Sequence, residues 1–337
     1  MKKYILILPF LLLAVFSVCA QPTDIKTLHA TARGFMNSGD YDNAIIVLTR
    51  ALQQDKNNVE LQKDLVMSYY LKRDYNKALD GVKVLLEDDN ADVVTFQIAG
   101  NVYKALEEVK ECEKVYKKGL KKFPKSGPLY SEYGELLWSA KDFTAIDYWE
   151  AGIKQDPGYS GNYYNAANYY FYTTDKVWSL LYAEIFINME SLSERGAAMK
   201  QLLLQGYKEK LLPQTDPAKD GEANKTEFAK AFLDITGKQS FLVNMGVTVE
   251  ALTMMRARFI LDWYNSWGAR FPFRLFDYHR QLLSEGMFDA YNQWLFGPVN
   301  NLGAYDAWIR SHPEEYKEFS DFQKTRVFRM PVGQTYH

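Results

Sequence analysis

The side chains best suited to acid–base chemistry gather in one short stretch of the second half of the sequence. Asp277, His279, Arg280 and Glu285 lie close together there, and an imidazole beside carboxylates can act as a general acid or base. The same spacing on an amphipathic helix is typical of a solvated face, and proton chemistry needs a mutual geometry that spacing alone does not supply. We therefore interpret the cluster as a solvated helix face, with a hydrolase that uses His279 as an alternative.

Other chemical motifs are missing from the sequence. It contains no HExxH, no GxSxG, no phosphate-binding glycine loop and no closely spaced cysteine pair for a metal. The two cysteines are Cys19 and Cys112, and Cys112 fits a small core position better than a reactive thiol, which needs an exposed, electropositive setting. We expect a non-enzymatic protein with no catalytic residue, no metal and no cofactor.

Residues 1–20 have the pattern of an export signal. Two lysines at positions 2 and 3 precede an apolar run from Tyr4 to Val18, which is shorter than the roughly 20 residues of a transmembrane helix. Val18-Cys19-Ala20 fits a small-residue cleavage site, so we expect cleavage after Ala20 and an exported protein that is periplasmic or envelope-associated. A lipid anchor at Cys19 is the minor alternative, because Val18 is a poor residue before an acylated cysteine.

The charge balance argues against nucleic acid as a partner. The chain has 40 Lys+Arg and 42 Asp+Glu, and loss of the signal lysines makes the balance more acidic. A nucleic-acid-binding protein normally shows a basic excess or a basic stripe.

The elements that carry these residues follow from an internal repeat. Gly39-Asp40-Tyr41-Asp42-Asn43-Ala44 is echoed 34 residues later by Arg73-Asp74-Tyr75-Asn76-Lys77-Ala78. A fixed period of this length predicts stacked helical hairpins, in which small residues lie where helices cross and large apolar residues fill the space around them. The register places the repeats at 25–58, 59–92, 93–126, 127–159 and 160–190, the last two being irregular.

This pattern resembles the tetratricopeptide repeat. Ala44, Ala78 and Cys112 share one small position of the unit, and Pro124 ends a second helix as proline does in that family. The resemblance covers about residues 25–190. It implies an all-α, right-handed solenoid of helical hairpins that binds a protein or peptide in a concave groove.

The resemblance also implies which side chains line that groove, since the family uses defined first-helix positions. Exposed aromatic residues and methionines on such a surface are typical of interface hot spots. The register gives ten candidates: Arg33, Met36, Met67, Tyr70, Asn101, Lys104, Glu135, Trp138, Asn168 and Phe171. An alternative is that Trp138 and Phe171 pack against the second half of the chain.

One subtype of the family holds a peptide's terminal carboxylate with Lys and Asn at groove positions. Repeat one offers His29 and Arg33 at these positions, and repeat two offers Lys63 and Met67. No adjacent repeat completes the set, so we do not expect a carboxylate clamp.

The remainder of the sequence predicts a cap, a linker and a second domain. Ser191-Leu192-Ser193-Glu194 is typical of a capping box that opens a capping helix over 191–212, so the solenoid region spans 23–212. Residues 213–224 contain prolines, a glycine and no periodicity, which indicates a linker. An aromatic-rich helical domain over 225–337 follows, with helices expected at 225–233, 249–267, 276–296, 302–310 and 313–326. Gly286 is an alternative break that would divide the third of these into two shorter helices, and Gly297-Pro298 is expected to stop it. We expect Arg258 and Asp262 to form an ion pair on the second of these.

Taken together, these patterns predict a protein-interaction scaffold of the bacterial envelope that binds a peptide or protein partner. The alternative is a lipid-anchored structural subunit of an envelope assembly that docks through the C-terminal domain.

Overall fold

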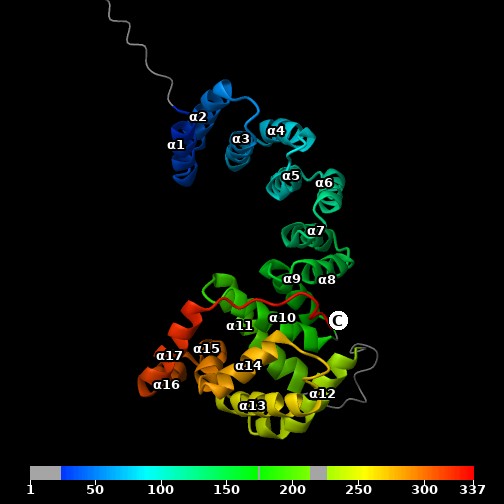
Figure 1. Ribbon diagram of the computed structural model, residues 1–337, viewed down its shortest axis with the longest axis vertical. Helices are drawn as coiled ribbons and strands as arrows, with labels where there is room; N and C mark the ends of the chain where they lie inside the picture. Colours follow the sequence, from blue (N-terminus) through cyan, green and yellow to red (C-terminus); the bar gives the residue numbers. More distant parts are fainter. Residues whose placement is uncertain (1–23, 174, 213–225) are drawn as a thin grey trace, which may run out of the picture. The chain divides into compact units, whose positions relative to one another are not determined.

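The computed structural model describes residues 24–173, 175–212 and 226–337, and all of its regular elements are helices (Figure 1). The expected all-α class, with paired helical hairpins and aromatic-rich C-terminal helices, is confirmed. The expected signal segment 1–20, with Cys19 and the cleavage site at Ala20, lies outside the described residues, as does the expected linker 213–224. Across the described ranges, no helix combines the length and hydropathy that a membrane span requires.

The chain forms two compact units, which divide between Ala91 and Asp92. Unit 1 contains two helical hairpins. Its helices are α1 (Ile25–Asn37), α2 (Tyr41–Gln54), α3 (Val59–Leu71) and α4 (Tyr75–Glu87). Its core is built from Leu28, Ala32, Leu48, Ala51 and Leu61.

The repeated sequence motif encodes the turn of each hairpin. Asp40 and Asp74 are N-caps whose carboxylates accept the backbone N–H of Asn43 and Lys77. The residue before each cap has a positive φ, 78° at Gly39 and 68° at Arg73. Position by position, the motif is therefore a left-handed turn followed by a helix cap.

Unit 2 continues the same hairpins. Its first six helices are α5 (Val93–Ala105), α6 (Val109–Lys122), α7 (Gly127–Ser139), α8 (Ala145–Gln155), α9 (Ser160–Phe171) and α10 (Lys176–Met189). Glu107 and Lys141 adopt φ values of 59° and 60°, so the left-handed turn recurs at the same 34-residue spacing. The irregularity of the fourth repeat therefore begins after Lys141.

Small residues lie where the hairpin helices cross. Cys112 is fully buried, and its Sγ donates to the carbonyl oxygen of Gly100 at 3.5 Å. Burial raises the pKa of the Cys112 thiol to about 11, so this cysteine is a packing residue, as expected. A Cβ on Gly100 would lie 2.2 Å from the Tyr116 hydroxyl oxygen, which shows how closely α5 and α6 approach.

The capping helix α11 (Glu194–Gln205) begins later than a box at Ser191 would place it. Ser193 is the N-cap, and its hydroxyl accepts the N–H of Gly196 at 3.0 Å. The helix then continues as a π-helical turn, η1 (Gly206–Leu211).

The C-terminal part of unit 2 contains six helices and one short 3₁₀ turn among the described residues. They are α12 (Glu227–Gln239), η3 (Ser240–Val243), α13 (Val249–Ser266), α14 (Arg274–Ser284), α15 (Phe288–Asn300), α16 (Leu302–Ser311) and α17 (Pro313–Thr325).

Two expectations for this region need correction. The expected helix 276–296 is two helices, α14 and α15, because the chain breaks at Gly286 with a φ of 75°, as the alternative had it; Pro298, expected to stop the helix, lies inside α15 near its end. Arg258 and Asp262 do not pair with each other. Asp262 accepts from Gln239 Nε2 at 2.7 Å, and the Arg258 guanidinium lies over the ring of Phe241.

One hydrophobic core joins the last repeats to the C-terminal helices. It includes Trp149 of α8, most of α10, and buried residues from α12 to α15 such as Phe228, Trp263 and Phe276. The two compact units divide after Ala91, whereas the expected division lay at the linker 213–224. The last repeats and the C-terminal helices share one core, in which α10 is buried on nearly every face.

Candidate functional site

The first helices of the hairpins in unit 2 form a continuous layer. α5 packs on α7, α7 on α9, and α9 on α11. Polar side chains connect neighbours within it, since Gln97 Nε2 donates to Glu132 Oε1 at 2.6 Å and Asn165 Nδ2 donates to Glu135 Oε1 at 2.9 Å. The hairpin repeat thus brings residues 30 to 35 positions apart into direct contact. We call the exposed side of α5, α7, α9 and α11 the first-helix surface.

The four charged or amide-bearing candidates of unit 2 lie on these helices in different settings. Glu135 is exposed, whereas Asn101, Lys104 and Asn168 are half-buried. The Lys104 ammonium lies 6.0 Å from the centre of the Tyr116 ring, and the Asn168 amide donates to the Tyr164 carbonyl oxygen of its own helix at 2.8 Å. Glu135 is therefore the most accessible of the four.

An exposed aromatic patch lies at the C-terminal ends of α7 and α9. Trp138 is 40% exposed and meets Phe143, 62% exposed, edge-on with ring centres 5.7 Å apart. Tyr169 contacts the same indole at 5.5 Å, and buried Trp149 lies beneath it at 6.2 Å. We call Trp138, Phe143 and Tyr169 the aromatic patch. Such rings contribute strongly to interfaces when they are covered.

The patch differs in two residues from the sequence expectation. Phe143 was not a candidate, because it lies in the turn before α8 and not at a first-helix position. Phe171 was a candidate, but it is only 8% exposed, so it packs into the fold. An aromatic residue in a short polar turn is the signal that would have found Phe143.

The candidates in unit 1 lie on α1 and α3. Arg33 is exposed, and its Nε donates to Asp64 Oδ2 at 2.7 Å. His29 Nε2 lies 2.6 Å from the same carboxylate oxygen. The three others, Met36, Met67 and Tyr70, are half-buried. The face at Arg33 is thus a charged network in which a single carboxylate binds two basic side chains.

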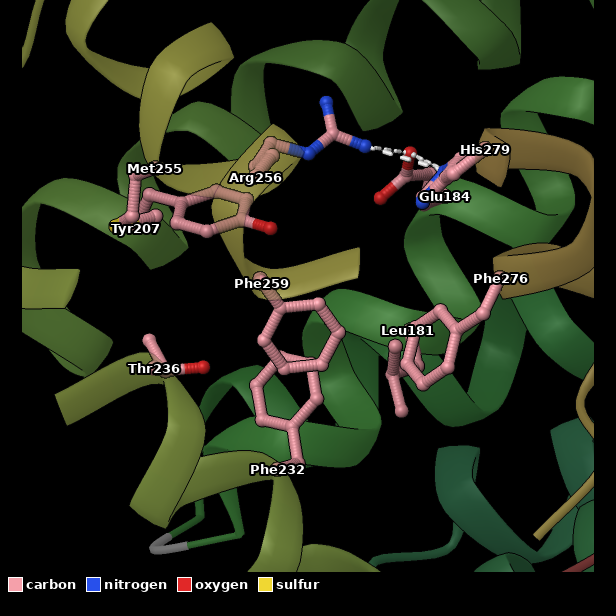
Figure 2. Close-up of a pocket in the computed structure, with 10 residues that line it drawn as sticks. All are labelled: Leu181, Glu184, Tyr207, Phe232, Thr236, Met255, Arg256, Phe259, Phe276 and His279. Atoms are coloured by element: carbon pink, nitrogen blue, oxygen red, sulfur yellow. Dashed lines mark hydrogen bonds and ion pairs between the residues drawn. The ribbon is translucent and has the colours of Figure 1, made fainter. Parts of the chain in front are cut away.

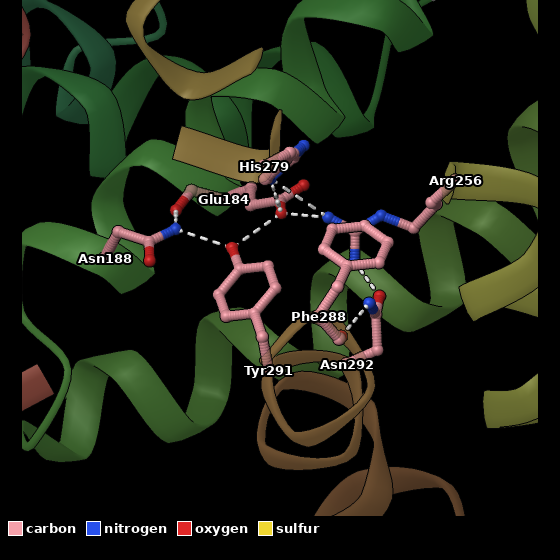
Figure 3. Close-up of polar contacts among 7 residues, drawn as sticks. All are labelled: Glu184, Asn188, Arg256, His279, Phe288, Tyr291 and Asn292. Atoms are coloured by element: carbon pink, nitrogen blue, oxygen red, sulfur yellow. Dashed lines mark hydrogen bonds and ion pairs between the residues drawn. The ribbon is translucent and has the colours of Figure 1, made fainter. Parts of the chain in front are cut away.

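A second polar constellation lies deep inside unit 2, and it was not expected. Glu184 of α10, Arg256 of α13, and His279 of α14 meet there, each at most 4% exposed (Figure 3). Arg256 donates to Glu184 Oε1 and to Asn292 Oδ1, and His279 Nε2 lies 2.8 Å from Glu184 Oε1. The Tyr291 hydroxyl donates to the same oxygen at 2.7 Å. We call this set the buried ionic cluster.

The cluster corrects the interpretation of His279 as part of a solvated face. Its neighbours in sequence do face outward, since Asp277 accepts from the Tyr264 hydroxyl at 2.5 Å and Arg280 lies over the Tyr264 ring. His279 projects from the opposite side of α14 into the core. Helical periodicity permits both directions within one turn, and the partner Glu184 is 95 residues away in sequence.

The charges in the cluster balance. Burial alone would raise the pKa of Glu184, but Arg256 and His279 lower it to about 2. Burial lowers the pKa of His279, against the opposing effect of Glu184. Burial also opposes the charge on Arg256, but Glu184 raises the pKa of that guanidinium. At neutral pH the cluster therefore contains one anion, one cation and a neutral imidazole.

A small cavity borders the cluster (Figure 2). It is lined by Leu181, Glu184, Tyr207, Phe232, Thr236, Met255, Arg256, Phe259, Phe276 and His279. Its volume is about 20 Å³, which is room for about one water molecule. A substrate has no space beside His279, so the geometry favours a structural role for this histidine over catalysis. In the part of the chain that the structure describes, no three His, Cys, Asp or Glu side chains are grouped to bind a metal.

Residues 35–96 match the family model of the tetratricopeptide repeat. The chain is therefore a helical-hairpin repeat protein with tetratricopeptide repeats in this part. No curated protein matches the chain.

Solved repeat proteins are similar to it at low identity. A tetratricopeptide protein of Thermus thermophilus is 15% identical with a TM-score of 0.45, covering 54% of this chain and 100% of that one. One from Parabacteroides merdae is 12% identical with a TM-score of 0.43, covering 77% and 98%. YrrB, described as having an unusual peptide-binding site, is 19% identical with a TM-score of 0.38, covering 53% and 92%. Similarity at this level carries no argument about function.

Proposed function

We propose that this protein is a non-enzymatic scaffold that binds a protein or peptide partner on the first-helix surface of unit 2. Tetratricopeptide repeats mediate protein and peptide binding, and stacked repeats offer an extended surface for it. The observation that carries the proposal is the edge-on contact of two exposed rings, Trp138 and Phe143, at the border of that surface. Large exposed rings beside polar groups are typical of binding anchors.

The polar part of the surface supports an extended backbone as the ligand. Glu135 and Asn165 lie next to each other there, and their side chains supply a carboxylate acceptor and an amide group. Such groups pair with the N–H and C=O groups of a peptide, which need partners when they are buried. The aromatic patch would then bury a side chain of the same ligand.

The test compares two double variants of matched exposure. Trp138→Ala/Phe143→Ala removes the patch, and Phe241→Ala/Leu261→Ala removes two side chains of the C-terminal helices that are 54% and 62% exposed. Partners are captured with wild-type protein by crosslinking, purified, and titrated against all three proteins. We expect the patch variant to weaken binding at least tenfold, since interface rings of this kind often contribute 2 kcal/mol or more.

The opposite ranking would refute this surface. If the patch variant binds like wild type and the Phe241/Leu261 variant does not, docking runs through the C-terminal helices. That result would favour the alternative function, a structural subunit of an envelope assembly.

We also propose that the protein is exported to the periplasm or envelope. This proposal rests on the sequence of residues 1–20 alone, with its basic start, its apolar run and the small residues before Gln21. Mass spectrometry of protein isolated from its own cells tests it. An N-terminus at Gln21 supports cleavage after Ala20, a diacylated Cys19 supports a lipid-anchored subunit, and an intact Met1 contradicts both.

A further inference from the structure

The last residues of the sequence fold back onto the repeats of unit 2. After α17, the chain from Arg326 onward has no helix, and Phe328 and Met330 are buried along its course. Figure 1 shows this segment as the red trace that returns toward α9 and α10. Gln334 Oε1 accepts the backbone N–H of Arg274 at 2.6 Å, and the Tyr336 hydroxyl donates to the Pro272 carbonyl oxygen at 2.7 Å. We call residues 328–337 the terminal segment.

The segment ends with His337 among acidic and aromatic side chains. His337 Nε2 lies 2.7 Å from the Tyr170 hydroxyl oxygen and 3.5 Å from Asp175 Oδ2. Its Nδ1 lies 3.8 Å from Glu150 Oε1. The edge of the ring contacts Trp178, with ring centres 5.6 Å apart. We call the residues around His337 the acidic cage: Glu150, Tyr170, Asp175, Trp178 and Tyr182, whose hydroxyl donates to Glu150.

The hydrogen bonds of the acidic cage determine where the protons of His337 lie. The hydroxyls of Tyr170 and Tyr182 both donate to Glu150 Oε1 at 3.0 Å. A hydroxyl has one proton to donate, so while Tyr170 donates to Glu150 its oxygen can only accept from His337 Nε2–H. The other ring nitrogen faces Glu150. With a proton on both nitrogens, the imidazolium places its positive charge 3.5 Å from Asp175 and 3.8 Å from Glu150, so it is the form that the cage fits.

The titratable groups that face His337 are Glu150 of α8, Tyr170 of α9 and Asp175 before α10, and Tyr182 of α10 stands behind Glu150, to which it donates. Burial alone would lower the pKa of His337, but the hydrogen bond to Asp175 and the charge of Glu150 raise it. Burial raises the pKa of Glu150, and His337 opposes this. Each group therefore stabilises the charge of the other.

We propose that the acidic cage is a binding site for a cationic side chain, and that the terminal segment is its ligand within this chain, held against the repeats by the charge of His337. The chemical class that the cage accepts is a cation next to an aromatic residue, here His337 after Tyr336. Tyr336 stacks on Phe228 with ring centres 4.9 Å apart, so the cation and the preceding ring dock side by side.

The dependence on pH follows from the direction of each shift. Because the pKa of docked His337 is raised, its contribution is complete below the pKa of the free imidazole and is lost as the pH rises through the docked value. Because the pKa of Glu150 is also raised, protonation of this carboxyl removes the attraction at lower pH. The terminal segment therefore docks most strongly at a pH between the pKa of Glu150 and the pKa of docked His337. It is released at alkaline pH.

The experiment measures hydrogen exchange of the amides of residues 330 and 332–336 in the full chain at pH 6 and pH 9, each corrected for the intrinsic rate at that pH. Wild type should lose protection at pH 9, by up to about tenfold for each unit by which the pKa is raised. His337→Gln should be weakly protected at both values. His337→Lys should stay protected at both, because an ammonium group remains charged at pH 9. His312→Gln, which changes an imidazole of α17's N-cap, is the matched control and should behave as wild type.

Two outcomes would overturn the proposal. Equal protection of wild type at both pH values would mean that Tyr336 and the apolar contacts hold the segment without His337. Failure of His337→Lys to exceed His337→Gln at pH 9 would mean that the cage does not recognise positive charge. Circular dichroism of each variant checks that the fold is intact. We expect it to be, because these substitutions alter a side chain at the surface of unit 2.

Discussion

His279 Nε2 lies 2.8 Å from Glu184 Oε1 in the interior of unit 2, where it connects α14 to α10. Arg256 adds α13 to the same carboxylate, and Tyr291 adds α15. Four helices therefore converge on one buried anion. The buried ionic cluster connects the C-terminal helices to α10, since a packing that separated these side chains would leave a buried charge without its partner.

Arg256→Met should destabilise the protein strongly. It would leave the Glu184 carboxylate buried without its cation, which typically costs about 3–5 kcal/mol. The unfolding free energy from urea denaturation measures this. Arg258→Met on the same helix is the matched control and should change it by about 1 kcal/mol or less, because Arg258 is exposed and lies over the exposed ring of Phe241.

Removing both charges of the pair should recover much of that loss. Glu184→Gln/Arg256→Met leaves no charge in the buried ionic cluster, so the double variant should be more stable than Arg256→Met alone. A double variant less stable than the single one would show that Glu184 does not depend on Arg256.

The stability of unit 2 should fall at acidic pH. The pKa of His279 is lowered by burial, so its contribution is present above the ordinary value of 6.5 and declines as the pH falls below it. Glu184, with a pKa of about 2, contributes above about 4.5 and loses its contribution between these values. Denaturation at pH 7.5 and pH 5.5 should therefore show a smaller pH effect in His279→Gln than in wild type. His312→Gln should retain the wild-type pH effect.

Two glycines should respond to alanine with opposite signs. A Cβ at Gly100 would collide with Tyr116, so Gly100→Ala should destabilise by about 1–3 kcal/mol. Gly237 in α12 has no neighbour within 4 Å of a built Cβ, so Gly237→Ala should stabilise by about 0.5–1 kcal/mol. Thermal unfolding of both variants checks the pair. Equal shifts would contradict the close approach of α5 and α6.

Lys200 is a buried ammonium whose charge is costly. Its Nζ donates to the Trp294 carbonyl oxygen at 2.8 Å, and burial lowers its pKa from 10.5 to about 7. Between these values the unfolded chain binds a proton that the folded protein does not, so stability rises with pH. The wild type should therefore gain about 2 kcal/mol relative to Lys200→Met between pH 7 and pH 9. A constant difference in unfolding free energy would mean that Trp294 keeps Lys200 charged.

The local sequence predicted the hairpins well, because their determinants are close in sequence. The motif at Asp40 and Asp74 encodes a turn and a cap, and Gly286 marked the break between α14 and α15. Boundaries failed where two signals competed, as at Ser191 and Ser193, or where proline lies near the end of a helix, as Pro298 does.

What the sequence determined by itself is the period, the helices and their small contact residues, since turns, caps and close approaches depend on residues within one hairpin. Only the tertiary structure decided that His279 faces Glu184, that Phe171 is buried while Phe143 is exposed, and that His337 returns to Glu150. Each of these depends on which side of a helix meets a distant element. Periodicity limits the faces a residue can occupy, but burial and charge pairing across the core select between them.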